Sequence, residues 1–77
     1  MDQESAKKAK ILKDFGANLE RLIYEKFKSR DAFLKVIEMH KANLHRLING
    51  EVDPQLTTLH KIADGLGVPV RDLFPSK

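Results

Sequence analysis

The chain of 77 residues contains no cysteine and no tryptophan, and its apolar residues never run for more than three positions. Without cysteine, neither disulfides nor thiolate metal ligands can hold the fold together. Without a long apolar run, no segment is suited to cross a bilayer as a helix, and the polar N-terminus lacks the apolar centre of a signal peptide. We therefore expect a cytoplasmic protein with no membrane partner.

Period-two alternation is also missing, so no strand is predicted. Apolar residues instead recur three and four positions apart, which places them on one face of a helix. This pattern predicts an all-α domain over residues 11–77 with five helices, the last a short one around Val70, Leu73 and Phe74. Residues 1–10 are lysine-rich and have no apolar face, so a frayed helix and a disordered basic arm both remain open.

Several residues mark where helices begin, end or pack. Ser29 is expected to cap one helix, and Gly50 fits the left-handed conformation just after another. Asp53 is expected to cap a helix with Pro54 in its first turn. Gly16 lies within a helix, where glycine costs about 1 kcal/mol relative to alanine. We therefore expect another backbone to approach there.

The segment that organises the rest is SRDAFLKVIEMHKANLHRLING, residues 29–50. It is predicted to form two short helices joined by a tight turn, with Met39 at their junction. Leu44, Leu47 and Ile48 share one face of the second helix. The opposite side carries small, hydrogen-bonding and cationic residues, a surface suited to insertion into a DNA major groove.

The distribution of charge is more informative than the net charge of +3. Residues 26–46 carry six basic residues against two acidic ones, and residues 1–13 carry four against two. Residues 14–25 and 47–77 are both net acidic. Positive charge gathered on the helix pair is what phosphate neutralisation requires, although an ordinary solvated basic surface is the alternative.

The stretches FGANLERL, LHRLING and DPQLTTLHKIADGLGVPVRDLF resemble the lambda-repressor-like, Cro-type (XRE family) helix-turn-helix domain over residues 14–75. The resemblance implies a compact five-helix, sequence-specific DNA-binding domain with its motif near residues 29–49. It further implies a transcriptional regulator, with a repressor expected, that acts as a homodimer on a palindromic double-stranded operator.

In this family the second helix of the motif, residues 41–48 here, enters the major groove. Arginine and lysine can address guanine, and asparagine can address adenine. The residues expected to contact bases are Lys41, Ala42, Asn43, His45 and Arg46. The residues expected to contact the DNA backbone are Lys26, Lys28, Ser29, Arg30, His40 and Asn49.

The chain departs from the family pattern in the motif and after it. Glu38 stands where the family has a glycine in the turn, so a left-handed glutamate is expected there. His40 replaces a better capping residue. Leu34 replaces an alanine where the two helices cross. Glu51 and Asp53 make the following loop acidic, which predicts weaker contact with phosphates.

Other classes of function fit less well. His40 and His45 are five residues apart and do not share a helical face, so no zinc site and no cofactor are expected. No nucleophile elbow, phosphate loop or metal-ligand spacing indicates an enzyme.

A protein-interaction module of the same fold, such as an antitoxin or an adaptor, is the alternative to a regulator. Ile48 is exposed in the family pattern. With Val68, Val70 and Phe74 it is expected to form a surface for self-association or for a toxin or other protein partner.

Overall fold

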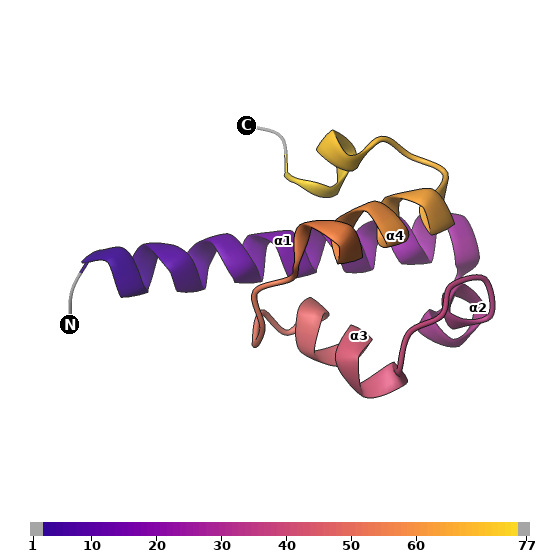
Figure 1. Ribbon diagram of the computed structural model, residues 1–77, viewed down its shortest axis with the longest axis horizontal. Helices are drawn as coiled ribbons and strands as arrows, with labels where there is room; N and C mark the ends of the chain where they lie inside the picture. Colours follow the sequence, from indigo (N-terminus) through magenta and orange to yellow (C-terminus); the bar gives the residue numbers. More distant parts are fainter. Residues whose placement is uncertain (1–2, 76–77) are drawn as a thin grey trace.

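The computed structural model describes residues 3–75, and every regular element in that range is helical (Figure 1). The elements are α1 (Gln3–Phe27), α2 (Arg30–Leu34), α3 (Lys41–Ile48), α4 (Leu56–Leu66) and η1 (Val70–Leu73). The expected all-α class is confirmed. The expected fifth helix is a single 3-10 turn, because only four residues separate Pro69 from Phe74, where the backbone becomes extended.

Helix α1 begins at Gln3 and so includes most of the segment for which a frayed helix and a disordered arm were both open. Good helix formers fill these first turns, and Glu4 lies where the helix dipole favours an anion. The first turns extend beyond the other elements (Figure 1), and burial of side chains in the core begins at Phe15. None of the helices in residues 3–75 combines the length and apolarity needed to span a membrane.

Helices α1 and α3 approach each other closely at Gly16, as the sequence predicted. A Cβ atom at this position would collide with the carbonyl oxygens of Leu47 and Ile48 in the last turn of α3. Only a residue without a side chain lets the two backbones come so near. The contact fixes where α3 lies along α1.

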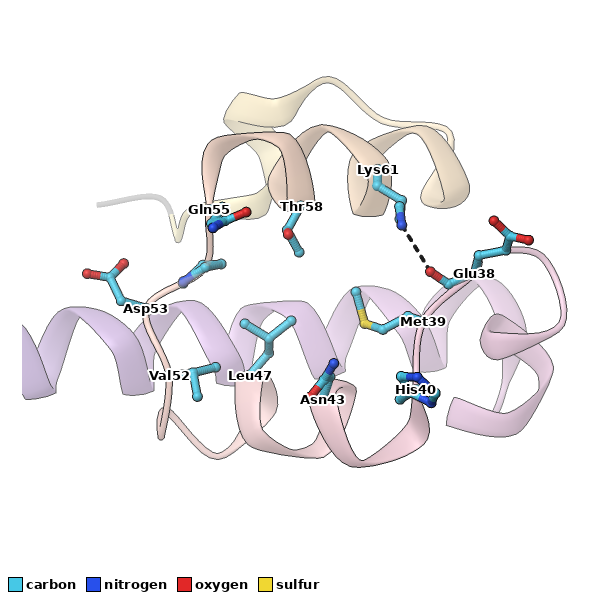
Figure 2. A pocket seen from close by; sticks show the side chains of 11 residues that line it. Glu38, Met39, His40, Asn43, Leu47, Val52, Asp53, Gln55, Thr58 and Lys61 are labelled. Carbon is cyan, nitrogen blue, oxygen red and sulfur yellow. Dashed lines mark hydrogen bonds between the residues drawn. The ribbon is translucent and has the colours of Figure 1, made fainter.

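The connection between α1 and α2 is only two residues long, and Lys28 adopts the left-handed conformation in it, with φ 72°. The expectation of a left-handed Glu38 was wrong, since Lys28 is the one non-glycine residue of the described range with positive φ. The longer connection from α2 to α3 unwinds through an ordinary turn and needs no such residue. Lys61 Nζ of α4 donates a hydrogen bond to the Glu38 carbonyl at 3.0 Å and holds this connection in place (Figure 2).

The end of α3 is closed by Gly50, which is left-handed with φ 74°, as predicted. The Gly50 N–H donates to the Leu47 carbonyl at 3.2 Å, and the Glu51 N–H donates to the Arg46 carbonyl at 2.9 Å. This pair of bonds is the Schellman arrangement, which satisfies carbonyls that the helix leaves free.

The start of α4 differs from the prediction. The helix begins at Leu56 and its N-cap is Gln55, which makes no side-chain capping bond. Asp53 is therefore not the cap. Its carboxylate instead lies 3.8 Å from the Lys8 ammonium of α1, while Pro54 belongs to the extended segment that leads to the helix.

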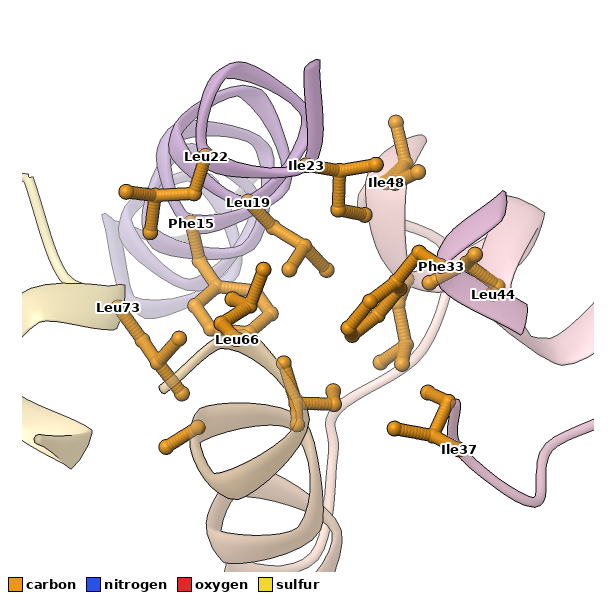
Figure 3. Packing of buried hydrophobic residues seen from close by; sticks show 13 residues of the cluster. Phe15, Leu19, Leu22, Ile23, Phe33, Ile37, Leu44, Ile48, Leu66 and Leu73 are labelled. Atoms are coloured by element: carbon orange, nitrogen blue, oxygen red, sulfur yellow. The ribbon is translucent and has the colours of Figure 1, made fainter. Parts of the chain in front are cut away.

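All five elements contribute to one apolar core (Figure 3). The rings of Phe27 and Phe33 lie 5.2 Å apart between their centroids, and those of Phe15 and Phe74 lie 5.9 Å apart. The buried apolar residues are Phe15, Leu19, Leu22, Ile23, Phe33, Ile37, Leu44, Leu47, Ile48, Ile62, Ala63, Leu66 and Leu73.

Asn18 is a buried polar residue that ties the C-terminal turn to α1. Its side-chain amide donates to the carbonyls of Asp72 and Leu73 at 3.1 and 2.8 Å, and its amide oxygen accepts from Arg21 at 2.8 Å. These bonds satisfy both ends of the amide, which removes the penalty for burying it.

The Gly16 contact determines whether Gly16→Ala raises or lowers the free energy of unfolding. Helix propensity alone would make Gly16→Ala stabilising by about 1 kcal/mol. Because the added methyl group meets the backbone of α3, we expect instead a loss of about 1–3 kcal/mol in urea unfolding. Ala17→Gly, at the exposed neighbouring position, is the control and should lose about 1 kcal/mol from propensity alone. A Gly16→Ala protein more stable than the parent would contradict the close approach.

Candidate nucleic-acid interface

The two helices of the motif, α2 and α3, begin at residues with the extended backbone of an N-cap. Ser29 has the extended backbone of an N-cap, and its hydroxyl oxygen accepts from the Ala32 N–H at 3.1 Å, as predicted. Helix α3 begins after His40, which also has an extended backbone but makes no side-chain capping bond. Met39 packs against the core at the junction, which agrees with its predicted place.

The inner face of α3 is buried completely. Leu44 is inaccessible to solvent, and Leu47 and Ile48 are 4% and 7% exposed. The prediction that Leu44 and Leu47 pack inward is confirmed. The expectation of an exposed Ile48 was wrong, because the close approach at Gly16 draws the last turn of α3 onto α1. Ile48 therefore cannot contribute to a self-association surface.

The outer face of α3 is open to solvent. Lys41, Ala42, Asn43 and Arg46 are all exposed. Helical spacing places Ala42 and Arg46 opposite the apolar side, and Lys41 and Asn43 along its two borders. A short helix thus presents two cations, an amide and a methyl group together, while its other face is fixed in the core. This is the geometry by which a helix can enter a groove about 12 Å wide without losing its support.

His45 is the exception among the predicted base-contacting residues, since it is only half-exposed. Its Nδ1 accepts a hydrogen bond from Nη1 of Arg30, at the start of α2. The Nη2 of the same guanidinium donates to the carboxylate of Glu20 in α1, at 2.5 Å. These three side chains, the Glu20–Arg30–His45 chain, connect α1, α2 and α3.

The family model for the Cro/C1-type HTH DNA-binding domain matches residues 18–75. The chain belongs to this family. The match includes both helices of the motif and extends through η1, and it begins four residues later than the resemblance read from the sequence. No curated protein and no solved structure matches the chain significantly. Membership of this family supports DNA binding, and the resemblance recognised in the sequence is confirmed.

The residues predicted to contact the DNA backbone in this Cro/C1-type domain differ in whether their side chains already bond to other protein groups. Lys26 and Lys28 are exposed and have no ion-pair partner within residues 3–75. The Ser29 hydroxyl is used as a cap, and the Arg30 guanidinium is used by the Glu20–Arg30–His45 chain. Asn49 is exposed and donates to Glu51 at 3.4 Å.

A cleft of about 380 Å³ separates the outer part of α3 from α4 (Figure 2). Met39 and Leu47 give it apolar surface, and polar groups of Asn43, Thr58 and Lys61 line its sides. One of these residues, Asn43, is also among the exposed residues of α3. Its lining residues are Glu38, Met39, His40, Asn43, Leu47, Val52, Asp53, Pro54, Gln55, Thr58 and Lys61.

Metal-binding geometry is not found among residues 3–75, where no three histidine, aspartate or glutamate side chains gather. Sequence reasoning missed two structural features of the interface: the left-handed Lys28 and the Glu20–Arg30–His45 chain. The two-residue link between α1 and α2 was a usable signal for the first. Nothing in the spacing of the residues indicated the second.

The uncapped start of α3 can be improved. His40 has the backbone of an N-cap, φ −69° and ψ 139°, but supplies no bond. We expect His40→Ser to raise the free energy of unfolding by about 1 kcal/mol, because a serine oxygen can accept from a free N–H of the first turn. Urea unfolding measures the gain. His60→Ser, at an exposed position inside α4, should give no gain; an equal gain there would contradict the capping explanation.

Proposed function

We propose that this domain is a sequence-specific transcriptional regulator, a repressor, that inserts α3 into the major groove of its operator. One observation carries the proposal. Helix α3 buries Leu44, Leu47 and Ile48 while the cationic and amide side chains of its other face remain exposed. Membership of the Cro/C1-type DNA-binding family supports it.

The proposed base contacts are made by residues whose present bonds are easily exchanged. Arg46 donates to Asn43 at 3.3 Å, and Lys41 lies 3.3 Å from Asp31, with all four side chains exposed. Exposed pairs of this kind contribute about 0–1 kcal/mol each. Arg46 and Lys41 can therefore turn to guanine, and Asn43 to adenine. Ala42 offers its methyl group to thymine. His45 is the fifth proposed base contact, and its imidazole is bonded to Arg30.

We assign the phosphate contacts mainly to Lys26 and Lys28. Both are exposed and lie just before the motif, where the charge of Arg30 is already balanced by Glu20. His40, Ser29 and Asn49 can add further hydrogen bonds, since hydroxyl, imidazole and amide groups also bond phosphate oxygens.

A homodimer on a palindromic operator is part of the proposal. A single module buries only about 600–1,000 Å² on DNA, and two-fold pairing on half-sites one helical turn apart raises both affinity and specificity. With Ile48 buried, the exposed Phe74 and Ile11 are the better candidates for the surface between subunits. They line an apolar groove of about 320 Å³ between α1 and the C-terminal turn.

That groove also favours the second candidate function, a domain that binds another protein such as a toxin. The two functions are compatible in one chain, because the groove and α3 use different residues. Selection of bound sequences from a random DNA pool separates them: paired half-sites indicate a DNA-bound homodimer, whereas no enrichment favours the protein partner.

The function itself is tested by titrating promoter DNA at several salt concentrations. We expect affinity to fall linearly with the logarithm of salt concentration, with a slope of about −0.9 for each phosphate neutralised. We also expect the operator to bind roughly 10³-fold or more tightly than random DNA. Equal affinity for both at every salt concentration would refute the regulator.

Two substitutions separate sequence reading from phosphate binding. Arg46→Ala should relax base preference at one position and weaken operator binding by about 1–3 kcal/mol, since a bidentate guanine contact is lost. Lys28→Gln should weaken operator and random DNA alike and make the salt slope shallower by about one phosphate. Fluorescence anisotropy against both DNAs measures the two effects. Identical effects of the two substitutions would contradict the assigned roles.

A further inference from the structure

The Glu20–Arg30–His45 chain orders the one predicted base-contacting residue that is not fully exposed. The Arg30 side chain is 23% exposed and lies between a carboxylate on one side and an imidazole on the other. The two partners are 10 and 15 residues away in sequence, and the three side chains belong to three different helices. The imidazole of His45 is therefore held from outside its own helix.

The chemistry of the guanidinium decides which tautomer of this imidazole it can bind. Arginine carries only N–H donors and no acceptor. The Nδ1 of His45 must therefore accept, with its lone pair free of a proton. In a neutral imidazole the proton is then on Nε2.

The Nε2 of His45 is not fully buried. It has no hydrogen-bond partner within residues 3–75, and no buried side-chain nitrogen or oxygen of that range lacks a partner. An unpartnered Nε2 that is not buried must be accessible. His45 also lies between Leu44 and Arg46 in α3, the helix proposed to enter the groove.

We infer that Arg30 holds His45 in the Nε2–H tautomer, so that this side chain of α3 offers DNA a single hydrogen-bond donor and reads an acceptor on a base edge. The inference rests on the proposed function for its second half. Acceptors in the major groove are N7 and O6 of guanine, N7 of adenine and O4 of thymine, whereas the N4 amino group of cytosine only donates. Without Arg30, the imidazole could present either a donor or an acceptor.

The first experiment uses the free protein and needs no DNA. Nitrogen NMR of the imidazoles in alkaline buffer should show His45 with an unprotonated Nδ1 and a protonated Nε2. His40 and His60 are exposed and have no side-chain partner among residues 3–75, so they serve as internal controls and should show averaged tautomers.

Variants of the chain test the cause of this state. Arg30→Met keeps an apolar stem but removes the donors, so the His45 nitrogens should move toward the averaged values of His40 and His60. Glu20→Gln keeps an acceptor for Arg30 and should leave the His45 tautomer unchanged, which separates loss of the donor from loss of folding. Averaged nitrogens in the parent protein, or no movement in Arg30→Met, would overturn the inference.

The second experiment uses the selected half-site with base analogues that each remove one major-groove acceptor. We expect one analogue to weaken binding of the parent about tenfold and to have no further effect on His45→Ala. Arg46→Ala, on the same helix, should keep that loss, and blocking a cytosine amino group should not reproduce it. An equal loss in His45→Ala at every analogue would overturn base reading by His45.

The two experiments also separate this inference from the proposed function. Failure of the parent to prefer any DNA sequence would refute the regulator and, with it, base reading by His45. The tautomer of the free protein would still be decided by NMR. A regulator that binds its operator with averaged His45 nitrogens would leave the proposed function intact and refute the inference.

Discussion

The contact between Gly16 and the last turn of α3 is the constraint on which the interface depends. Two helix backbones can approach this closely only where one of them has no side chain, and the approach places the carbonyls of Leu47 and Ile48 against α1. Once this end of α3 is fixed, its apolar side faces the core. On its other side Lys41, Ala42, Asn43 and Arg46 are exposed to solvent, and His45 is half-exposed beside Arg30 of α2.

Much of the fold could be predicted because the apolar spacing reports helical faces directly. Leu44 and Leu47, predicted to share one apolar face of their helix, are 0% and 4% exposed. The left-handed Gly50 followed from the limited conformations open to other residues at a helix end. These are local effects, so a single sequence contains the information that they require.

The wrong predictions concern residues whose neighbours in the structure are far away in the sequence. Asp53 has the chemistry of an N-cap, but an ammonium group on α1 lies near its carboxylate and the helix starts three residues later. Ile48 has the apolarity of a core residue and the family position of a surface one, and only the approach of α1 decides between them. Asn18 was overlooked because an asparagine inside a helix is usually solvated, whereas here the C-terminal turn covers it.

The candidate site also contains some features that the sequence predicted and others that it did not. The exposed residues of α3 were identified from periodicity and the family pattern together. The Glu20–Arg30–His45 chain was not, because charged residues far apart in sequence carry no periodic signal of their proximity. It converts a side chain that could hydrogen-bond in two ways into one with a defined polarity.

The left-handed Lys28 has a consequence for how this protein balances rigidity against affinity. A lysine in that conformation costs about 1–2 kcal/mol that a glycine would not. Under the proposed function, the cation at this bend faces the phosphates. Replacing Lys28 by glycine would relieve the backbone strain and remove a positive charge in one step. The same substitution would therefore raise the free energy of unfolding and lower the affinity for DNA.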